Sequence, residues 1–164
     1  MCRATATFNY DADGNRVKTV IGAVPTYYIG NYYEVSGSNI TKYYYAGGQR
    51  VAMRLNSANP IFLFSDNLGS TTATYQDGSP VTITHQLYTA WGAVRPGPGN
   101  LLPTDNTYTG QKTIESIGLM FYNARYYDTY LNRWVQPDSI IPDPYNPQDY
   151  DRYAYVHSNP IHWA

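Results

Sequence analysis

Residues 10–16 read Tyr-Asp-Ala-Asp-Gly-Asn-Arg and lie between two strand-like segments, residues 5–8 and 17–20. The pair Asp13-Gly14 has the chemistry of a tight hairpin turn, because glycine adopts positive φ at little cost and aspartate tolerates it. One hairpin alone is only marginally stable in water, so such a unit must pack against others to bury its aromatic side. The stretch therefore predicts antiparallel β structure built from successive hairpins.

The same order of residues recurs along the chain: an aromatic residue, then turn residues that end in glycine, then a strand-like run. It is found again at residues 44–47 and 88–92. Asp77-Gly78 predicts a further hairpin, with positive φ at Gly78 as at Gly14. Other strand-like runs cover residues 26–35, 40–45, 50–55, 61–64, 70–75 and 81–88. We therefore predict an all-β fold of successive antiparallel hairpins, with helix limited to a turn or two near residues 151–157.

The run from Leu119 to Tyr127 is predicted to be the most buried strand. Its first four residues, 119–122, are all apolar or aromatic, which is typical of a strand covered on both faces. Arg125 in this run must then be enclosed and paired with a carboxylate or carbonyl group, because an isolated buried charge costs several kcal/mol. Asp128 and Asp138 are the nearest acidic candidates in the sequence. Residues 131–136 are expected to complete a hairpin with this run.

The composition supports the all-β prediction. The 164 residues include 19 Tyr, 13 Gly and 11 Pro, whereas charged residues make up only 14%. Tyrosine fits a pleated, half-buried surface, and glycine and proline supply turns. The prolines at 137, 142, 144 and 147 predict an extended segment that forms no sheet of its own.

Several function classes are not expected. The net charge is −1 and no basic run occurs, which argues against nucleic-acid binding. No apolar run reaches the roughly 20 residues of a membrane span, and the first residues lack the apolar core of a signal peptide. A single cysteine, Cys2, and three scattered histidines, His85, His157 and His162, predict no disulfide framework, metal site or cofactor.

Several motifs resemble those of a known family. Residues 10–16 resemble the Y-D-x-x-G-N-R unit of YD repeats, and residues 66–71 resemble the D-H-L-G-S-T block of the Rhs core, with Asn67 in place of His. Residues 118–128 are similar to G-L-Y-Y-Y-N-A-R-Y-Y-D, and residues 152–160 to L-Y-A-Y-V-x-N-N-P. In this order, the motifs make the chain resemble the Rhs/YD-repeat family and its C-terminal core-associated domain, which also relates it to polymorphic toxins, insecticidal toxin-complex shell proteins and teneurins.

The resemblance implies a β-sheet strip that spirals into a hollow shell. It divides the chain into repeat-like hairpins (1–95), a Pro/Gly-rich loop (96–107) and a core-associated segment (108–164). The expected function is that of a structural shell segment of a secreted or cell-surface protein, which encapsulates and helps to deliver a C-terminal effector (toxin) domain. The expected partners are the rest of its own shell, the effector and secretion-apparatus proteins. Both ends of the hairpin array look uncapped, so we expect a fragment of a longer array.

The resemblance also implies a hypothesis of self-cleavage, because several family members cut their own chain just after the core segment with acidic residues and an arginine. Arg133 matches that arginine, and the first acid aligns with Gln148, which has Asp149 and Asp151 as near neighbours. The second acid would follow Ala164. Aspartyl chemistry needs two carboxylates that share a proton, so this chain is not expected to cleave itself or to act as an enzyme. The acids are expected instead to cap turns and to pair with Arg133 or Arg152.

A second alternative is an adhesion or carbohydrate-binding module built on the aromatic β surface. Tyr126, Tyr127 and Trp134 would then form an exposed platform for sugar rings around an available Arg125. In the shell interpretation the same rings form packing ladders between strands. The exposure of these three rings distinguishes the binding-module interpretation from the shell interpretation.

Overall fold

The computed structural model describes residues 5–97 and 101–163. Its strands form two sheets, one of nine strands and one of four, and its helical segments are at most four residues long. The all-β prediction is therefore confirmed. The chain divides into two compact units: the N-terminal unit comprises residues up to 65 together with 72–85, and the C-terminal unit comprises residues 66–71 and those from 86 onward. The division at residues 95 and 107 expected from the family stays a prediction.

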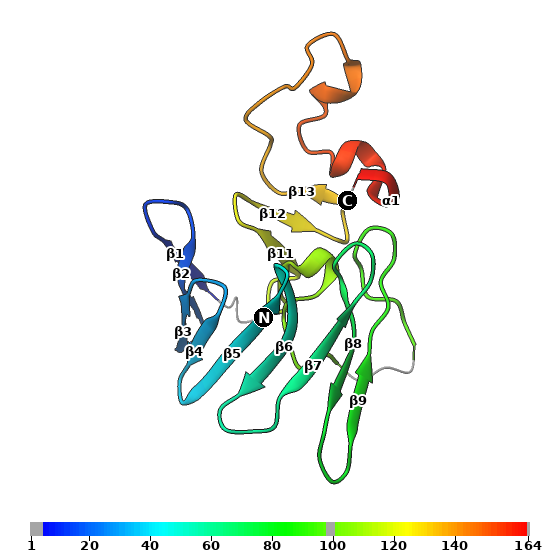
Figure 1. Cartoon of the computed structure of the whole chain (residues 1–164). Helices are drawn as coiled ribbons and strands as arrows, with labels where there is room; N and C mark the ends of the chain where they lie inside the picture. The colour runs from blue at the N-terminus through cyan, green and yellow to red at the C-terminus, as the bar shows by residue number, and fades with distance from the viewer. Residues whose placement is uncertain (1–4, 98–100, 164) are drawn as a thin grey trace. The chain divides into compact units, whose positions relative to one another are not determined.

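The nine-stranded sheet follows the order of the chain, so that each strand pairs with the next one (Figure 1). The recorded pairs are antiparallel. The strands are β1 (Ala6–Tyr10), β2 (Arg16–Ile21), β3 (Val24–Ile29), β4 (Tyr33–Ser36), β5 (Asn39–Ala46), β6 (Gln49–Leu55), β7 (Ile61–Ser65), β8 (Thr71–Gln76) and β9 (Thr82–His85). Tyr43, Met53, Ile61 and Leu63 form the buried apolar cluster of the N-terminal unit.

The turn between β1 and β2 closes on an aspartate and a glycine. Asp11 accepts hydrogen bonds from the backbone of Asp13 at 3.0 Å and of Asn15 at 2.8 Å, and from the Asn15 amide. Hydrogen bonds from Asn15 lower the pKa of the Asp11 carboxyl. Gly14 has a φ of +82°, so the turn predicted at Asp13-Gly14 is confirmed. The same backbone hydrogen bonds recur at residues 66–70, 89–93 and 107–111. In each turn the N–H of the first residue donates to the carbonyl of the fifth, and the N–H of a positive-φ glycine in fourth place donates to the carbonyl of the first.

Replacing Gly14 by valine is expected to lower the free energy of unfolding by about 1–2 kcal/mol, because a β-branched residue resists positive φ. The cost is one of backbone conformation, since no atom lies within 4 Å of where a Cβ would be. A thermal melt of the variant measures it. A melting curve that coincides with that of the parent would contradict the role assigned to this turn.

The prediction for Gly78 is half right. The residue lies in the connection between the antiparallel strands β8 and β9, but its φ is not positive. The connection runs from Asp77 to Val81 and contains a cis Ser79-Pro80 bond, so it is longer than a two-residue turn. The backbone carbonyl of Asp77 accepts a hydrogen bond from the Asn59 amide at 2.9 Å. A five-residue loop distributes the reversal over more residues and does not require positive φ at the glycine.

The four-stranded sheet lies in the C-terminal unit. It contains β10 (Lys112–Ile114), β11 (Leu119–Tyr122), β12 (Arg125–Asp128) and β13 (Arg133–Trp134), again in chain order. The single strand predicted over residues 119–127 is therefore wrong, since β11 and β12 form a hairpin. Asn123, at a φ of +55°, makes the turn, and asparagine is one of the few residues that tolerate this conformation. The pairing predicted for residues 131–136 is confirmed for β13 only.

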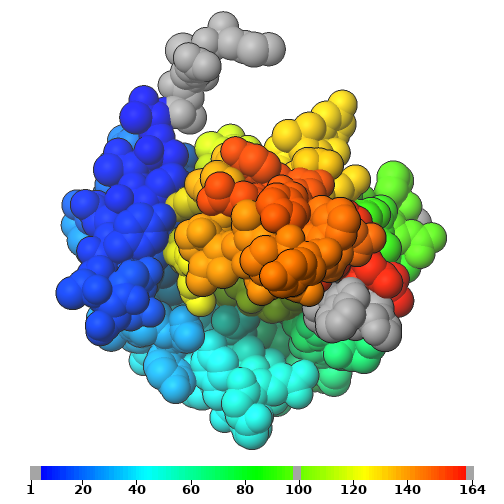
Figure 2. Space-filling view, turned by 90° about the horizontal axis from the view of Figure 1, so that it is seen from above, coloured from blue at the N-terminus to red at the C-terminus, as the bar shows by residue number. Residues whose placement is uncertain are grey.

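The helical segments are short. They are η1 (Tyr108–Gly110), η2 (Pro147–Tyr150), η3 (Val156–Ser158) and α1 (Pro160–Trp163). The helix expected near residues 151–157 is present as η2 and η3, which lie on either side of residues 151–155, whereas η1 lies outside the predicted region. The proline-rich residues 137–146 contain neither strand nor helix. Figure 2 shows this segment, in orange, as a layer over yellow residues of the same unit. No helix in the part of the chain that the structure describes is long and apolar enough to cross a membrane.

Candidate functional site

Several ionisable residues of the C-terminal unit line one pocket. This cavity of about 220 Å³ lies beside β12 and β13, and the residues that follow β13 close it. Trp134 forms part of its wall. The ionisable side chains that line it are Arg125, Asp138, Asp149, Asp151, Arg152 and His157. Two of the residues predicted from the family, Asp149 and Asp151, therefore border the same cavity.

Asp149 is the buried acid of the pocket, with a side chain only 3% exposed. One of its oxygens accepts a hydrogen bond from the backbone N–H of Asp143 at 2.9 Å. The other accepts one from the Asn146 amide at 3.3 Å and lies 3.2 Å from Nδ1 of His157. The carboxylate thus ties three points of the segment 143–157 together.

Arg133 and Asp151 form an ion pair at the surface. The two guanidinium Nη atoms lie 3.2 Å from the two carboxylate oxygens of Asp151. A backbone bridge between Arg133 and Ala154 brings the segments together. Both side chains are about half exposed, at 54% and 41%, so the pair contributes at most about 1 kcal/mol. The structure joins the predicted arginine to one predicted acid, and Asp149 is held separately. Arg133, Asp149 and Asp151 stay candidates for self-cleavage in a longer chain only, which is an untested prediction.

Arg125 is paired as the sequence suggested. Its Nη1 lies 2.7 Å from the Asp138 carboxylate, and its guanidinium carbon lies 4.1 Å from the centre of the Trp134 ring. The side chain is 26% exposed, so it is half-buried and not enclosed. The backbone of Asp138 also makes two hydrogen bonds to Arg152: its N–H donates to the Arg152 carbonyl at 2.7 Å, and its carbonyl accepts from the side-chain Nε of Arg152.

All three carboxylates of the pocket therefore have cationic or ring-nitrogen partners. Among the described residues, no group of three or more His, Cys, Asp or Glu side chains could hold a metal ion. The arrangement fastens the segment 137–157 onto β12 and β13. Sequence reasoning missed His157, because the only signal for it was an isolated histidine eight positions after an acid.

Asp149→Ala is expected to loosen this segment, because it leaves the Asp143 N–H without its acceptor at a cost of about 1–3 kcal/mol. Trypsin cleavage after Arg152 reports the opening and should become about 10- to 100-fold faster. Asp149→Asn keeps one acceptor oxygen and should have a smaller effect. Equal cleavage rates in the parent and in Asp149→Ala would show that the carboxylate does not hold the segment.

The exposed platform expected at Tyr126, Tyr127 and Trp134 does not form, because Tyr127 and Trp134 are buried and Tyr126 is half-buried. Tyr127 is 0% exposed and Trp134 is 8% exposed. Both belong to the core of the C-terminal unit with Tyr108, Met120 and Tyr155. The Tyr127 and Tyr155 ring centres are 4.3 Å apart. These rings are packing partners and are not available to a ligand.

The buried phenols of this core also hold it through hydrogen bonds. Tyr127 donates to the Trp91 carbonyl at 2.9 Å, and Tyr108 donates to the Ala90 carbonyl at 2.8 Å. Burial raises the pKa of Tyr108 to about 12 and that of Tyr88 to about 12. Burial likewise raises the pKa of Tyr127.

Stability is therefore expected to fall in alkali. Unfolded tyrosine ionises near pH 10, so the unfolded state loses its protons first. The stabilisation from these phenols is fully present below about pH 10 and is lost as the pH rises towards 12. Urea midpoints at pH 8, 10 and 11.5 measure the loss, and Tyr108→Phe should reduce its slope. A midpoint that is constant over this range would contradict the burial of the phenols.

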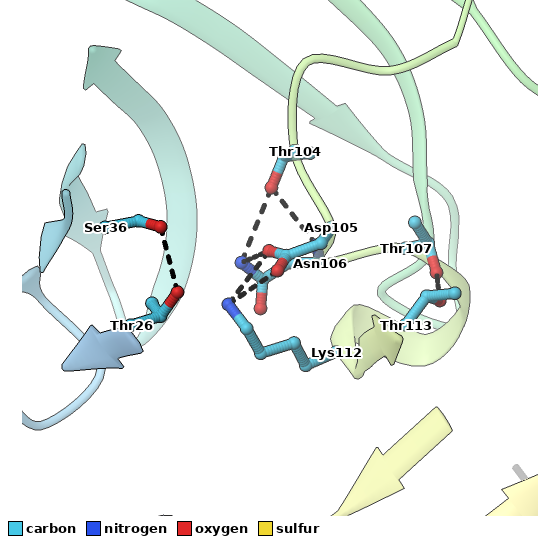
Figure 3. A network of polar contacts seen from close by, with 8 residues as sticks. All are labelled: Thr26, Ser36, Thr104, Asp105, Asn106, Thr107, Lys112 and Thr113. Atoms are coloured by element: carbon cyan, nitrogen blue, oxygen red, sulfur yellow. Dashed lines mark hydrogen bonds and ion pairs between the residues drawn. The ribbon is translucent and has the colours of Figure 1, made fainter. Parts of the chain in front are cut away.

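A second polar cluster anchors β10 (Figure 3). Lys112 lies 2.8 Å from the Asp105 carboxylate. The buried Thr104 accepts a hydrogen bond from the backbone N–H of Asn106 at 3.1 Å, and Thr107 and Thr113 share another. These contacts satisfy polar groups that would be costly to bury unpaired. The cluster is therefore structural.

The chain is similar to segments of much larger proteins, although no protein-family model matches it. It is 30% identical over 189 residues to the tRNA3(Ser)-specific nuclease WapA of Bacillus spizizenii, and the match covers 97% of this chain and 8% of that protein. It is 31% identical to the tRNA nuclease WapA of Bacillus subtilis, with the same coverage. It is 29% identical to human teneurin-4 over 79% of this chain and 5% of that protein.

Solved structures share the fold. The complex TcdB2-TccC3-Cdc42 matches with a TM-score of 0.72 and 17% identity, over 94% of this chain and 8% of the matched chain. The Tc holotoxin pore of Photorhabdus luminescens matches with a TM-score of 0.75 and 17% identity, over 97% of this chain and 9% of the other. These structures show the fold alone. The sequence matches to the WapA proteins and to teneurin-4, together with the motifs at residues 10–16 and 118–128, show that the chain belongs to the Rhs/YD-repeat family.

Proposed function

We propose that this chain is a segment of the β-sheet shell of a secreted or cell-surface Rhs/YD-repeat protein, and that the shell encapsulates and helps to deliver a C-terminal effector. The observation that carries the proposal is the fold itself. Its nine-stranded sheet keeps the order of the chain, and the fold matches Tc toxin structures over nearly the whole chain. The partners are then the rest of the shell, the effector and secretion-apparatus proteins.

The sheet is suited to extension. Strands β1 and β9 stand at its two ends and each has a single partner strand among the described residues. The outer edge of such a strand presents backbone groups that can pair with a further strand. A hairpin array of this kind can therefore grow in both directions by the same hydrogen bonds that hold it together.

The C-terminal unit contributes rigidity. Its core of stacked rings and the fastened segment 137–157 form a compact body on four short strands. A shell segment needs such packing to keep a cargo enclosed. It needs no catalytic site of its own for that role. The relatives named as nucleases span far more sequence than this chain, which leaves room for an effector elsewhere in proteins of this kind.

The test uses the full-length natural protein that contains this segment. Limited proteolysis is expected to spare the sequence downstream of the segment while the native shell is intact. Partial denaturation in urea should expose that sequence, and electron microscopy of the intact protein should show a hollow particle. Digestion of the downstream sequence at the same rate in native and denatured protein would overturn the proposal.

A further inference from the structure

A second cavity in the C-terminal unit is lined by hydroxyl groups and apolar side chains. Four of its lining residues are Thr104, Thr107, Thr113 and Thr129, and we call the cavity the threonine pocket. The first three of these threonines belong to the polar cluster beside β10 that Figure 3 shows. The threonine pocket shares no lining residue with the pocket that Asp149 borders, so it is a separate cavity.

The size of the threonine pocket limits what it can hold. Its volume is about 130 Å³. Sites for drug-sized ligands and cofactors measure about 300–1,000 Å³, whereas a cavity of about 150 Å³ holds a molecule of six carbon atoms. The threonine pocket can therefore take a single side chain or a short carbon chain, and it is too small for a nucleotide or a coenzyme.

The lining of the pocket changes from exposed apolar side chains to buried residues. Val94 is 54% exposed and Leu101 is 74% exposed, whereas Thr104 is 7% exposed and Met120 is 4% exposed. Val94 and Leu101 therefore lie at the mouth, and Thr104 and Met120 lie at the floor. An apolar mouth above polar groups fits a ligand with an apolar stem and a polar end.

The electrostatics of the pocket favour a cation. Glu115 is the only charged residue that lines it in the part of the chain that the structure describes. No recorded ion pair within the described ranges involves Glu115. Gln86 also lines the pocket, and its Nε2 donates to the Tyr88 hydroxyl at 3.1 Å, which leaves its carbonyl oxygen to accept from another donor. A carboxylate accepts only, so these residues suit a ligand that brings N–H donors and a positive charge.

We propose that the threonine pocket binds a lysine side chain presented by a peptide segment, a binding activity separate from the shell function. The four-carbon stem would pack on Val94 and Leu101, and the ammonium group would pair with Glu115. An ammonium has three N–H donors, which the carboxylate, the Gln86 carbonyl and a threonine hydroxyl can accept. The single acid disfavours carboxylate and phosphate ligands.

Two other cations fit less well. The planar guanidinium of an arginine has five donors, which need more acceptors than this pocket provides. A free diamine has the same head group as lysine, but its second ammonium would lie at the apolar mouth beside Val94 and Leu101. The exposed side chains at the mouth would instead contact the neighbouring atoms of a peptide.

Methionine methyl groups report binding directly. In this chain with isotope-labelled methionine methyls, Met120 lies in the pocket, and Met53 in the buried cluster of the N-terminal unit is the internal control. Titration with Nα-acetyl-lysine methylamide should shift the Met120 resonance saturably and leave the Met53 resonance in place. The norleucine analogue keeps the stem and lacks the ammonium, so it should bind about tenfold more weakly. A Met120 resonance that does not move, or equal binding of the norleucine analogue, would overturn the proposal.

Two further probes test the class of ligand. Putrescine is a free four-carbon diamine, and Nα-acetyl-arginine methylamide carries a guanidinium. Both should bind more weakly than the lysine probe, for the reasons of donor number and apolar mouth given above. Equal or tighter binding of either one would overturn the assignment to a peptide lysine.

Matched variants locate the site. Glu115→Gln should weaken binding of the lysine probe about tenfold, because it removes the charge of the pocket. Asp13→Asn is the control, since it removes an exposed carboxylate of the N-terminal unit and changes the net charge by the same amount. The control should stay within about twofold of the parent. Equal losses in the two variants would mean a general effect of charge and would contradict the assignment to the pocket.

Thermal stability separates a binding role of Glu115 from a structural one. Glu115 is exposed, so Glu115→Gln should leave the melting temperature unchanged while binding weakens. A lower melting temperature with unchanged binding would show that Glu115 serves the fold only. Protease protection in the full-length protein does not depend on this pocket, so either proposal can fail without the other.

Discussion

Replacing Trp134 by alanine is expected to lower the free energy of unfolding of the C-terminal unit by about 3–5 kcal/mol. The indole packs edge-on against Tyr122 at 5.1 Å and against Tyr155 at 5.3 Å between ring centres, and Arg125 lies over its face. Truncation leaves a cavity in the core and removes all of these contacts at once. It also frees Arg125 from one of its two recorded partners.

Urea denaturation followed by tryptophan fluorescence measures this loss. All three tryptophans lie in the C-terminal unit, and Trp91 still reports its unfolding in the variant. Val135→Ala is the matched control, because it changes the neighbouring residue, which is 47% exposed. The control should shift stability by about 0.5 kcal/mol or less. Similar losses in the two variants would mean that the ring cluster does not carry the stability of this unit.

The sequence predicted the features that depend on local chemistry. The turn at Asp13-Gly14 follows from the conformations that these two residues allow, and the structure has it. The Asp138 partner of Arg125 was among the nearest acids. The turn at Asn123 was missed because the apolar pattern on both sides of it read as one continuous strand. A single asparagine between aromatic residues is a weak signal, although its tolerance of positive φ is what ends the strand.

Features that depend on distant residues could not be predicted. The contact between Asp149 and His157 arises only once the segment 143–157 folds back on itself. The burial of Tyr127 depends on a hydrogen bond to Trp91, which lies 36 positions earlier. Lys42 in β5 is paired with Arg54 in β6, and this pairing depends on the strand register, which a shift of one residue would change. Each of these needs the tertiary arrangement, which local propensity does not determine.

Gly92→Ala is expected to destabilise the C-terminal unit by about 2–5 kcal/mol, the sum of a backbone cost and a steric cost. Gly92 has a φ of +81°, and a Cβ on it would lie 2.5 Å from Cδ1 of Tyr108. The ring cannot retreat freely, because Tyr108 is 2% exposed and its hydroxyl is bonded to the Ala90 carbonyl. Urea denaturation measures the total, again through tryptophan fluorescence.

Gly118→Ala isolates the backbone cost in the same unit. Gly118 has a φ of +69° and no atom within 4 Å of where a Cβ would lie, so its replacement should cost only about 1–2 kcal/mol. The steric part is then tested by a double-mutant cycle with Tyr108→Ala. Once the ring is gone, Gly92→Ala should cost no more than Gly118→Ala. If Gly92→Ala costs the same with and without the Tyr108 ring, close packing of the ring on the turn at residues 89–93 is not the reason for glycine at this position.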